Sequence, residues 1–413
     1  MITMKEMCKK LSEAANTLAI VETKCKNDAL KKVANSLNIN KKMILNANKK
    51  DIEEAKRNNM KESLIDRLRL NEERIDDMVK GIETIIKLKD PIWKSNNVWT
   101  LENGLTISKM SVPLGVIGII YESRPNVTVD AFSLALKSGN GILLRGGSSA
   151  INSNRALVNV IKEGLKESDI SEDVIAFVDT TDRSVIHEML TMNEYIDLII
   201  PRGGAELIQF VVKNATVPTI ETGVGNCHIF VDDSADVQKS IDIIENAKAQ
   251  RPGVCNACET VLIHKNIAKN VLPKLYDCLH NRVEMRGCEK TQSIIPIKEA
   301  TNADWAEEYL DYIVAIKIVE NMDEAISHIY KYGTKHSEAI LTESLHNANL
   351  FTRKVDAAAV YVNASTRFTD GSQFGFGAEM GISTQKIHAR GPIGLDELVS
   401  MKYKIIGNGQ IRE

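Results

Sequence analysis

The first ninety residues carry the apolar spacing of amphipathic helices. Leu11, Ala15 and Leu18 recur at helical intervals, and a second such set runs through residues 44–55, with Lys and Asn filling many of the other positions. The segment Lys89-Asp90-Pro91 ends this region, because a proline disfavours helix at the residue before it. The pattern predicts a helical N-terminal section.

Two short extended runs follow, at 98–101 and 105–108, joined by Glu102-Asn103-Gly104. Asn-Gly between two extended runs is a strong signal for a β-hairpin. A two-stranded hairpin is unstable alone, so we expect it to pair with further chain. The extended piece Tyr403–Ile406 in the tail is a candidate partner strand.

From Val116 onward, short apolar runs alternate with amphipathic helices, which is typical of a mostly parallel sheet with right-handed crossovers. We expect strands at 116–120, 142–144, 175–178, 198–200, 219–221, 229–231 and 261–263, and helices at 127–136, 150–165, 206–213 and 237–249. A second series adds strand 313–319, helix 322–332, strand 338–341, helix 344–355 and strand 358–362. The sequence therefore predicts an α/β protein with two interleaved parallel-sheet domains.

Composition excludes several classes of protein. The chain has 413 residues, of which 43% are hydrophobic and 26% charged, as in an ordinary globular protein with room for two domains. Lys+Arg 52 against Asp+Glu 55 gives 52 − 55 = −3, so no basic excess favours nucleic acid as a partner. The longest apolar runs, such as Val116–Tyr121, are far shorter than the roughly 20 residues that cross a membrane.

The N-terminus and the cysteines predict a cytoplasmic protein. The segment from Met1 to Lys10 is charged too early to hold the apolar stretch of a secretion signal. The seven cysteines are an odd number, and Cys255 and Cys258 lie three positions apart, which suits a compartment where thiols stay reduced.

Cys255 is the leading candidate for chemistry. It lies in the segment 250–260, between a predicted helix and a predicted strand, where Pro252 and Gly253 restrict the backbone. A thiolate on such a loop is a plausible nucleophile. A small buried thiol, a redox pair with Cys258 or half of a zinc site are alternatives, although no second Cys-x-x-Cys exists and we predict no metal.

Two other segments place polar groups at strand ends. Asn126 closes a polar turn after the apolar run 116–121, where open α/β folds bind ligands, although Asn is also a common helix cap. The turns 144–149 and 201–206 each carry an arginine and two glycines between a strand and a helix, which is a natural phosphate seat or simply a tight turn. Gly223-Val224-Gly225 is only a weak fragment of a dinucleotide fingerprint.

Taken together, these segments resemble the aldehyde dehydrogenase superfamily, and most closely its branch that reduces an acyl phosphate of glutamate. The resemblance covers nearly the whole chain, and four blocks carry it: Glu122–Asn126, Glu221–His228, Gln250–Asn256 and Gly371–Thr384. It implies an NADP(H)-binding domain at residues 1–97 and 111–224, a catalytic domain at 225–385, and an oligomerisation hairpin and tail at 98–110 and 399–413.

The resemblance also implies a reaction in L-proline biosynthesis. L-glutamyl 5-phosphate and NADPH would give L-glutamate 5-semialdehyde, NADP and phosphate through a cysteine thioester. Cys255 matches the nucleophile, and Asn126 matches the asparagine that stabilises the oxyanion. The dinucleotide-binding positions fall on Arg145, Gly146, Gly147 and Ser148 and on Arg202, Gly203 and Gly204, and the ribose-binding acid on Glu308. We expect the site to lower the thiol pKa from its ordinary value of about 8.5.

Several positions depart from the oxidising members of the superfamily. Arg145 replaces their usual lysine and suits a 2′-phosphate, which favours NADPH over NADH. Glu221 matches a general base that hydrolyses thioesters, a step that a reductase does not need, so its role stays open. Arg124 and Arg367 are candidates for binding the substrate's carboxylate and phosphate, since guanidinium groups bind both in a fork.

Two other functions remain as alternatives. One is an acylating or oxidising aldehyde dehydrogenase with a different substrate, and the other is a thiol sensor that uses Cys255 and Cys258 as a redox switch. We expect a homo-oligomer and no membrane. We also expect a functional partnership with a glutamate kinase, because an acyl phosphate hydrolyses readily. The kinase is expected to be a separate chain, because 413 residues leave no room for it here.

Overall fold

The computed structural model describes residues 3–182 and 184–412 and divides into two compact units. Unit 1 comprises Met1–Glu221, Gly375–Gly381 and Ile393–Glu413, and unit 2 comprises Thr222–Phe374 and Ile382–Pro392. The chain ends at residues 1 and 413, where two of the predicted boundaries fall, lie outside the described residues. The main crossing between the units falls at 221/222, three residues before the predicted one, and segment 375–381 returns to unit 1.

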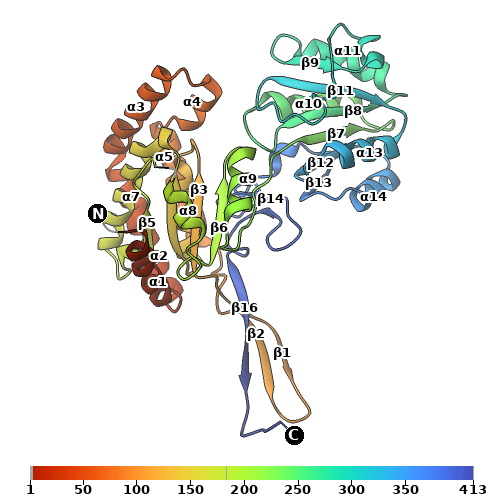
Figure 1. Ribbon diagram of the computed structural model, residues 1–413. Helices are drawn as coiled ribbons and strands as arrows, with labels where there is room; N and C mark the ends of the chain where they lie inside the picture. The colour runs from red at the N-terminus through yellow and green to blue at the C-terminus, as the bar shows by residue number, and fades with distance from the viewer. Residues whose placement is uncertain (1–2, 183, 413) are drawn as a thin grey trace. The chain divides into compact units, whose positions relative to one another are not determined.

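Unit 1 is built on a parallel four-stranded sheet in the order β5-β4-β3-β6 (Figure 1). Its strands are β3 (Val116–Tyr121), β4 (Gly141–Gly146), β5 (Ile175–Phe177) and β6 (Leu198–Arg202). All residues of β3 and β4 are buried, as expected for central parallel strands covered on both faces. Its helices are α1 (Met4–Leu18), α2 (Thr23–Ile39), α3 (Lys41–Arg57), α4 (Glu62–Leu68), α5 (Glu72–Lys87), α6 (Asn126–Lys137), α7 (Ile151–Lys166), α8 (Ser184–Leu190) and α9 (Ala205–Asn214), with short 3₁₀ turns η1 (Ser148–Ala150) and η2 (Glu172–Val174).

The predicted hairpin forms strands β1 (Ser95–Thr100) and β2 (Thr106–Pro113), which are antiparallel. The tail strand β16 (Val399–Ile406) pairs with the other edge of β2, so the predicted partner is confirmed. Gly104 takes φ +88° in the turn, a left-handed conformation that glycine adopts without a steric penalty. The result is a three-stranded antiparallel sheet within unit 1.

Unit 2 is built on a parallel seven-stranded sheet in the order β10-β9-β11-β8-β7-β12-β13 (Figure 1). The strands are β7 (Cys227–Val231), β8 (Cys258–His264), β9 (Glu284–Gly287), β10 (Lys298–Glu299), β11 (Ile313–Val319), β12 (Ser337–Leu341) and β13 (Ala359–Val362). The helices are α10 (Val237–Ala249), α11 (Ala268–Leu279), α12 (Glu289–Gln292), α13 (Met322–Tyr332) and α14 (Leu345–Lys354), followed by η3 (Thr366–Phe368) and the short antiparallel pair β14 (Ile382–Ser383) and β15 (Gly391–Pro392). Apolar side chains of β7, β8 and β11 pack with α10 and α11 in its larger core.

The predicted two-sheet α/β fold is confirmed, with local corrections. The strand expected at 219–221 is wrong, because only Thr219 makes an isolated bridge, to Ile199. The helix expected from residue 150 begins as the 3₁₀ turn η1 and becomes α-helical at Ile151. Helix α11 and strand β9 were not predicted. In the part of the chain that the structure describes, no helix is both long and apolar enough to cross a membrane.

Candidate active site

The carboxyl ends of three strands bring the predicted segments of unit 1 together. Tyr121, the last residue of β3, is in register with Gly146 of β4 on one side and with Arg202 of β6 on the other. The segment Glu122–Asn126 and both glycine turns therefore leave the sheet at the same edge. This is the position where open α/β sheets bind ligands.

The two glycine turns differ in what their helices bind. The first leads into η1 and then α7, and the backbone amides of Asn152 and Ser153 donate to the carboxylate of Asp51 at 3.2 and 2.7 Å. The second leads directly into α9, where the Gly204 amide donates to Oε2 of Glu122 at 2.9 Å. The N-terminus of α7 is therefore bound by a buried acid of α3, whereas that of α9 binds an exposed acid.

Asn126 is the first residue of α6 and not its cap. The N-cap position belongs to Pro125, and the Asn126 amide nitrogen donates to Oδ2 of Asp130 one turn further along, at 2.9 Å. The helix-cap interpretation of Asn126 is therefore wrong. Arg124 lies in the same turn and is half-buried.

The arginines of the two turns lie in different surroundings. Arg145 lies next to the last residue of β4 and is only 8% exposed. Arg202 is half-buried, and its guanidinium lies 3.4 Å from Oε1 of Glu379, in the segment 375–381 that belongs to the same unit. Ser148 opens η1, and Gly203 and Gly204 are exposed at the start of α9. Glu221 is the last residue of unit 1 before the chain crosses to unit 2.

In unit 2, Cys255 lies on the loop 250–257 between α10 and β8, as predicted. The loop is folded on itself, because the Ala257 amide donates to the Val254 carbonyl at 3.0 Å. The buried thiol of Cys227 donates to the Cys255 carbonyl at 3.1 Å. Cys255 itself is partly exposed.

Cys258 has a different environment from Cys255. It is the first residue of β8, fully buried, and its thiol donates to the Thr260 carbonyl at 3.3 Å. Burial raises the pKa of the Cys258 thiol far above its ordinary range, which makes it a poor nucleophile and a poor redox partner. Among the residues described by the structure, no group of three or more His, Cys, Asp or Glu side chains is arranged to hold a metal ion.

Arg367 holds the cysteine loop from η3. Its Nε donates to Oε1 of Gln250 at 3.1 Å, and its terminal nitrogen donates to Oδ1 of Asn256, the residue after Cys255. The Asn256 side chain in turn donates to the Thr369 carbonyl at 2.8 Å. Burial lowers the pKa of the Arg367 guanidinium. Arg367 therefore bonds to one residue before Cys255 and to one residue after it, a structural role that the sequence did not indicate.

Gly225 connects Cys255 with Glu308. Its amide donates to Oε1 of Glu308 at 2.7 Å, and a Cβ at this position would overlap the backbone of Cys255. The Gly223–Gly225 segment resembles a weak nucleotide fingerprint in sequence, but in the structure the Gly225 backbone packs against the backbone of Cys255. Within unit 2 the structure thus brings together Cys255, Glu308 and Arg367.

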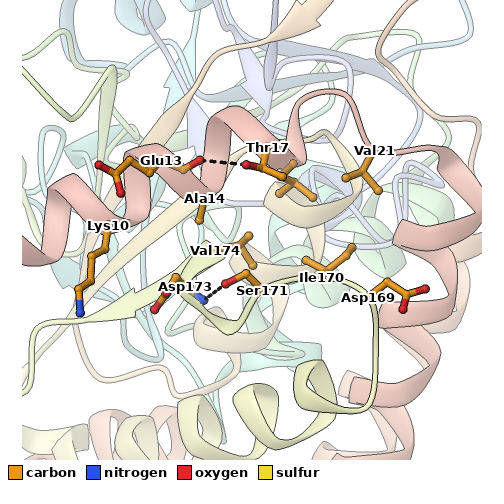
Figure 2. A pocket seen from close by; sticks show the side chains of 11 residues that line it. Lys10, Glu13, Ala14, Thr17, Val21, Asp169, Ile170, Ser171, Asp173 and Val174 are labelled. Carbon is orange, nitrogen blue, oxygen red and sulfur yellow. Dashed lines mark hydrogen bonds between the residues drawn. The ribbon is translucent and has the colours of Figure 1, made fainter.

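A separate cavity of about 420 Å³ in unit 1 lies between α1 and the segment 169–174 (Figure 2). Lys10, Glu13 and Asp173 are among its polar lining residues. The Thr17 hydroxyl donates to the Glu13 carbonyl, and the Ser171 hydroxyl accepts from the Asp173 amide, so both are bonded within their own segments. None of the predicted site residues lines this cavity.

Comparison with known proteins decides the family. The profile of the aldehyde dehydrogenase family matches residues 3–315. The chain belongs to the aldehyde dehydrogenase family. Within this family it is 69% identical over 413 residues to a gamma-glutamyl phosphate reductase of Alkaliphilus metalliredigens, with 100% of each chain covered. It therefore groups with the gamma-glutamyl phosphate reductases of the aldehyde dehydrogenase family.

Solved structures of aldehyde dehydrogenase family members agree with the fold. The crystal structure of the gamma-glutamyl phosphate reductase of Thermotoga maritima superposes with a TM-score of 0.94 at 57% identity, covering 99% of each chain. An acetylating aldehyde dehydrogenase of Geobacillus thermoglucosidasius superposes with a TM-score of 0.72 at 15% identity, covering 98% of this chain and 97% of that one. The second likeness concerns the fold alone.

Some residues in and around the candidate site were not predicted from the sequence. Asp51 precedes the first predicted site segment, which begins at Glu122, by 122 − 51 = 71 residues, and Glu122 was predicted only as part of a turn. Lys248 and Glu259 flank the cysteine loop as a buried ion pair. A lysine and a glutamate beside a predicted loop are ordinarily exposed, so their residue types do not predict a buried pair. Only their closeness to Cys255 in the sequence indicated that they belong near the site.

Proposed function

We propose that the protein reduces L-glutamyl 5-phosphate to L-glutamate 5-semialdehyde with release of phosphate, as a step of L-proline biosynthesis. The observation that carries the proposal is the 69% identity, over the full chain, to a protein named gamma-glutamyl phosphate reductase. The partly exposed Cys255 on a fixed loop of unit 2 supports it, because a covalent step requires an accessible nucleophile.

We propose NADPH as the reductant, and the residues of unit 1 fit its diphosphate. Gly203 and Gly204 are exposed at the start of α9, and the Gly204 amide already binds an anionic oxygen, that of Glu122. Because Asp51 binds the start of α7, the second glycine turn is the better phosphate seat of the two. Arg145 and Arg202 are the proposed partners for further phosphate charge, and Glu308 for the nicotinamide ribose. When bound, NADPH supplies a hydride.

Cys255 carries the covalent chemistry in this proposal. Its thiolate attacks the acyl carbon of the substrate, the C–O bond to phosphate breaks, and inorganic phosphate leaves with the bonding electrons. The thioester so formed accepts hydride more readily than a carboxylate does. The resulting thiohemiacetal loses its hydroxyl proton, releases the aldehyde and restores the Cys255 thiolate.

Negative charge develops on one oxygen in both addition steps. We propose that the Asn126 amide and the Cys255 backbone N–H stabilise it, and one such donor contributes about 3 kcal/mol to transition-state stabilisation. Arg124 remains the proposed partner of a substrate anion. Arg367 is a weaker candidate for direct substrate binding, because its guanidinium is already bonded to Gln250 and Asn256. The role of Glu221 stays unassigned.

We further propose that the protein works in the cytoplasm as a homo-oligomer and in functional partnership with a glutamate kinase, since acyl phosphates hydrolyse readily. The three-stranded sheet supports self-association. Its edge strands β1 and β16 expose apolar side chains, among them Val98 at 60% and Tyr403 at 58%. Exposed edges of this kind commonly pair with another chain.

An assay in the reverse direction tests the reaction. Purified protein should reduce NADP in the presence of L-glutamate 5-semialdehyde only when phosphate is added. The Cys255→Ser variant should lose this activity, and mass spectrometry should find a glutamyl adduct on Cys255 of the wild-type protein during turnover. Cys258→Ser is the matched control and should lose little activity, because its thiol is buried in β8.

The same assay separates the alternatives. Oxidation of aldehydes without a requirement for phosphate would indicate a different aldehyde dehydrogenase. Undiminished activity of Cys255→Ser would contradict the mechanism. A thiol sensor predicts that Cys255→Ser and Cys258→Ser have similar effects.

A further inference from the structure

A fully buried ion pair closes the base of the cysteine loop. Lys248 lies in the last turn of α10, just before the loop, and Glu259 is the second residue of β8, just after it. Nζ of Lys248 lies 2.5 Å from Oε2 of Glu259, and both side chains are 0% exposed. The pair thus joins the two ends of the segment that carries Cys255.

The other oxygen of Glu259 reaches the segment that carries Glu308. Oε1 of Glu259 accepts a hydrogen bond of 3.3 Å from the Leu310 amide, and Nζ of Lys248 lies 5.8 Å from the centre of the Tyr309 ring. Leu310 has φ +52°, a left-handed conformation that is rare for leucine and persists only when surrounding contacts hold it. The ion pair therefore contacts both residues that follow Glu308.

Stability alone does not explain this pair. Removing two charges from water costs much of what their attraction returns, so apolar residues of similar volume are often at least as stabilising. Burial raises the pKa of the Glu259 carboxyl, and the ammonium of Lys248 opposes that rise. The ion pair is buried in spite of this cost and lies between two segments of the candidate active site. This location indicates that the pair positions the two segments.

We propose that Lys248 and Glu259 are positioning residues that fix the Cys255 loop relative to the Glu308 segment. The assignment rests on the proposed function for the roles of Cys255 and Glu308. Neither residue of the pair is proposed to touch substrate. They act through the backbone at 250–257 and at Leu310. Gly225 is a second link between the same two segments, because it contacts both Cys255 and Glu308.

The decisive variant replaces both charges by apolar side chains, Lys248→Met together with Glu259→Met. It leaves no buried charge without a counter-charge, so we expect it to fold. Glu259→Asp is the second variant, which keeps the charge but shortens the side chain by one methylene. Lys265→Met is the matched control, because Lys265 follows the far end of β8 and forms an exposed ion pair of 2.9 Å with Glu320.

Three measurements are made on each protein after circular dichroism has shown that it is folded. The first is the rate of iodoacetamide alkylation at Cys255, followed by peptide mass spectrometry without substrate. The second is the dissociation constant of NADPH, and the third is kcat and KM in the phosphate-dependent assay. For the double variant we expect a changed alkylation rate, weaker NADPH binding and a kcat lower by about tenfold to a hundredfold with little change in the KM for semialdehyde.

Each outcome decides the proposal. Unchanged alkylation and NADPH binding in a folded double variant would overturn it, as would equal changes in Lys265→Met. If the double variant does not fold, Glu259→Asp decides by the same measurements. A wild-type protein without phosphate-dependent activity would refute the proposed function instead, while alkylation at Cys255 would still report whether the pair positions the loop.

Discussion

The backbone of Gly225 lies so close to the carbonyl group of Cys255 that no side-chain carbon fits between them. The Gly225 amide also donates to Glu308 at 2.7 Å. Any residue larger than glycine must displace the Cys255 loop, the Glu308 segment or the start of β7. The position of Cys255, the proposed nucleophile, thus depends on a residue that has no side chain.

Gly225→Ala should therefore reduce activity strongly. The added methyl group pushes directly on the Cys255 backbone, and a displacement of about 1 Å at a reacting atom can cost about a hundredfold in rate. We expect kcat in the phosphate-dependent assay to fall by that order while the protein remains folded by circular dichroism.

Gly81→Ala is the control for this substitution. Gly81 lies inside α5, and a Cβ there would meet only the Gly377 carbonyl at an ordinary 3.8 Å. Alanine favours helix over glycine, so the variant should keep its activity and gain up to about 1 kcal/mol in stability. Equal losses of activity in the two variants would show that Gly225 has no special effect on Cys255.

The sequence predicts the strands of this protein better than it predicts its contacts. Strand 313–319 and helix 322–332 have the predicted bounds, because a buried apolar run and an amphipathic period determine them locally. Helix α11 was missed although Val271, Leu272 and Leu275 are buried at helical spacing, and Pro273 lies inside it. A proline in a helix interior removes a hydrogen bond and usually argues against the helix.

The candidate site shows the same difference between local patterns, which the sequence predicts, and contacts between distant residues, which it does not. Cys255 lies on the predicted loop, because a helix and a strand around a Pro-Gly turn are local features. The binding of Asp51 to the start of α7 joins residues about a hundred positions apart, and no local pattern contains that information. The two glycine turns therefore look alike in sequence, although their helices bind different acids in the structure.

Asp51→Asn should destabilise the protein without impairing chemistry. The buried Asp51 carboxylate accepts from the Asn152 and Ser153 amides and from the Ser153 hydroxyl at 2.5 Å, and an amide offers only one acceptor oxygen. We expect a loss of about 1–3 kcal/mol in urea unfolding, since buried donors lose their partner.

Asp236→Asn provides the comparison for Asp51→Asn. Asp236 caps α10 by accepting the Lys239 amide at 2.9 Å, and asparagine caps helices about as well as aspartate. Its unfolding free energy should hardly change. Unaltered stability of Asp51→Asn, or a loss of NADPH binding in it, would contradict this assignment and return the start of α7 to consideration as a phosphate seat.

Glu122→Gln should tighten NADPH binding. If the diphosphate takes the start of α9, it meets the Glu122 carboxylate that now accepts the Gly204 amide. Removing one exposed negative charge at a helix N-terminus is worth about 0.3–1 kcal/mol to an incoming anion, or roughly twofold to fivefold in the dissociation constant. The gain should shrink in high salt. Glu188→Gln, an exposed acid on α8 of the same unit, should leave the dissociation constant unchanged.

His328 should make the protein lose stability in acid. It is 4% exposed in α13, its ring lies 5.4 Å from Trp305 and 5.6 Å from His228, and burial lowers its pKa to about 3. An unfolded histidine takes up a proton below about pH 6.5, whereas folded His328 stays neutral. Stability is therefore complete above pH 6.5 and falls as the pH drops, by about 2 kcal/mol at pH 5.

His328→Phe removes this dependence and keeps the aromatic contacts. In the described part of the chain neither ring nitrogen of His328 has a hydrogen-bond partner, so phenylalanine loses no bond and the variant should be at least as stable at pH 7.5. Urea unfolding at pH 7.5, 6.5, 5.5 and 5.0 should give a shallower acid slope than in the wild-type protein. His346→Gln, an exposed histidine of α14, should keep the wild-type slope. Equal slopes in His328→Phe and the wild-type protein would mean that buried His328 accepts its proton while folded.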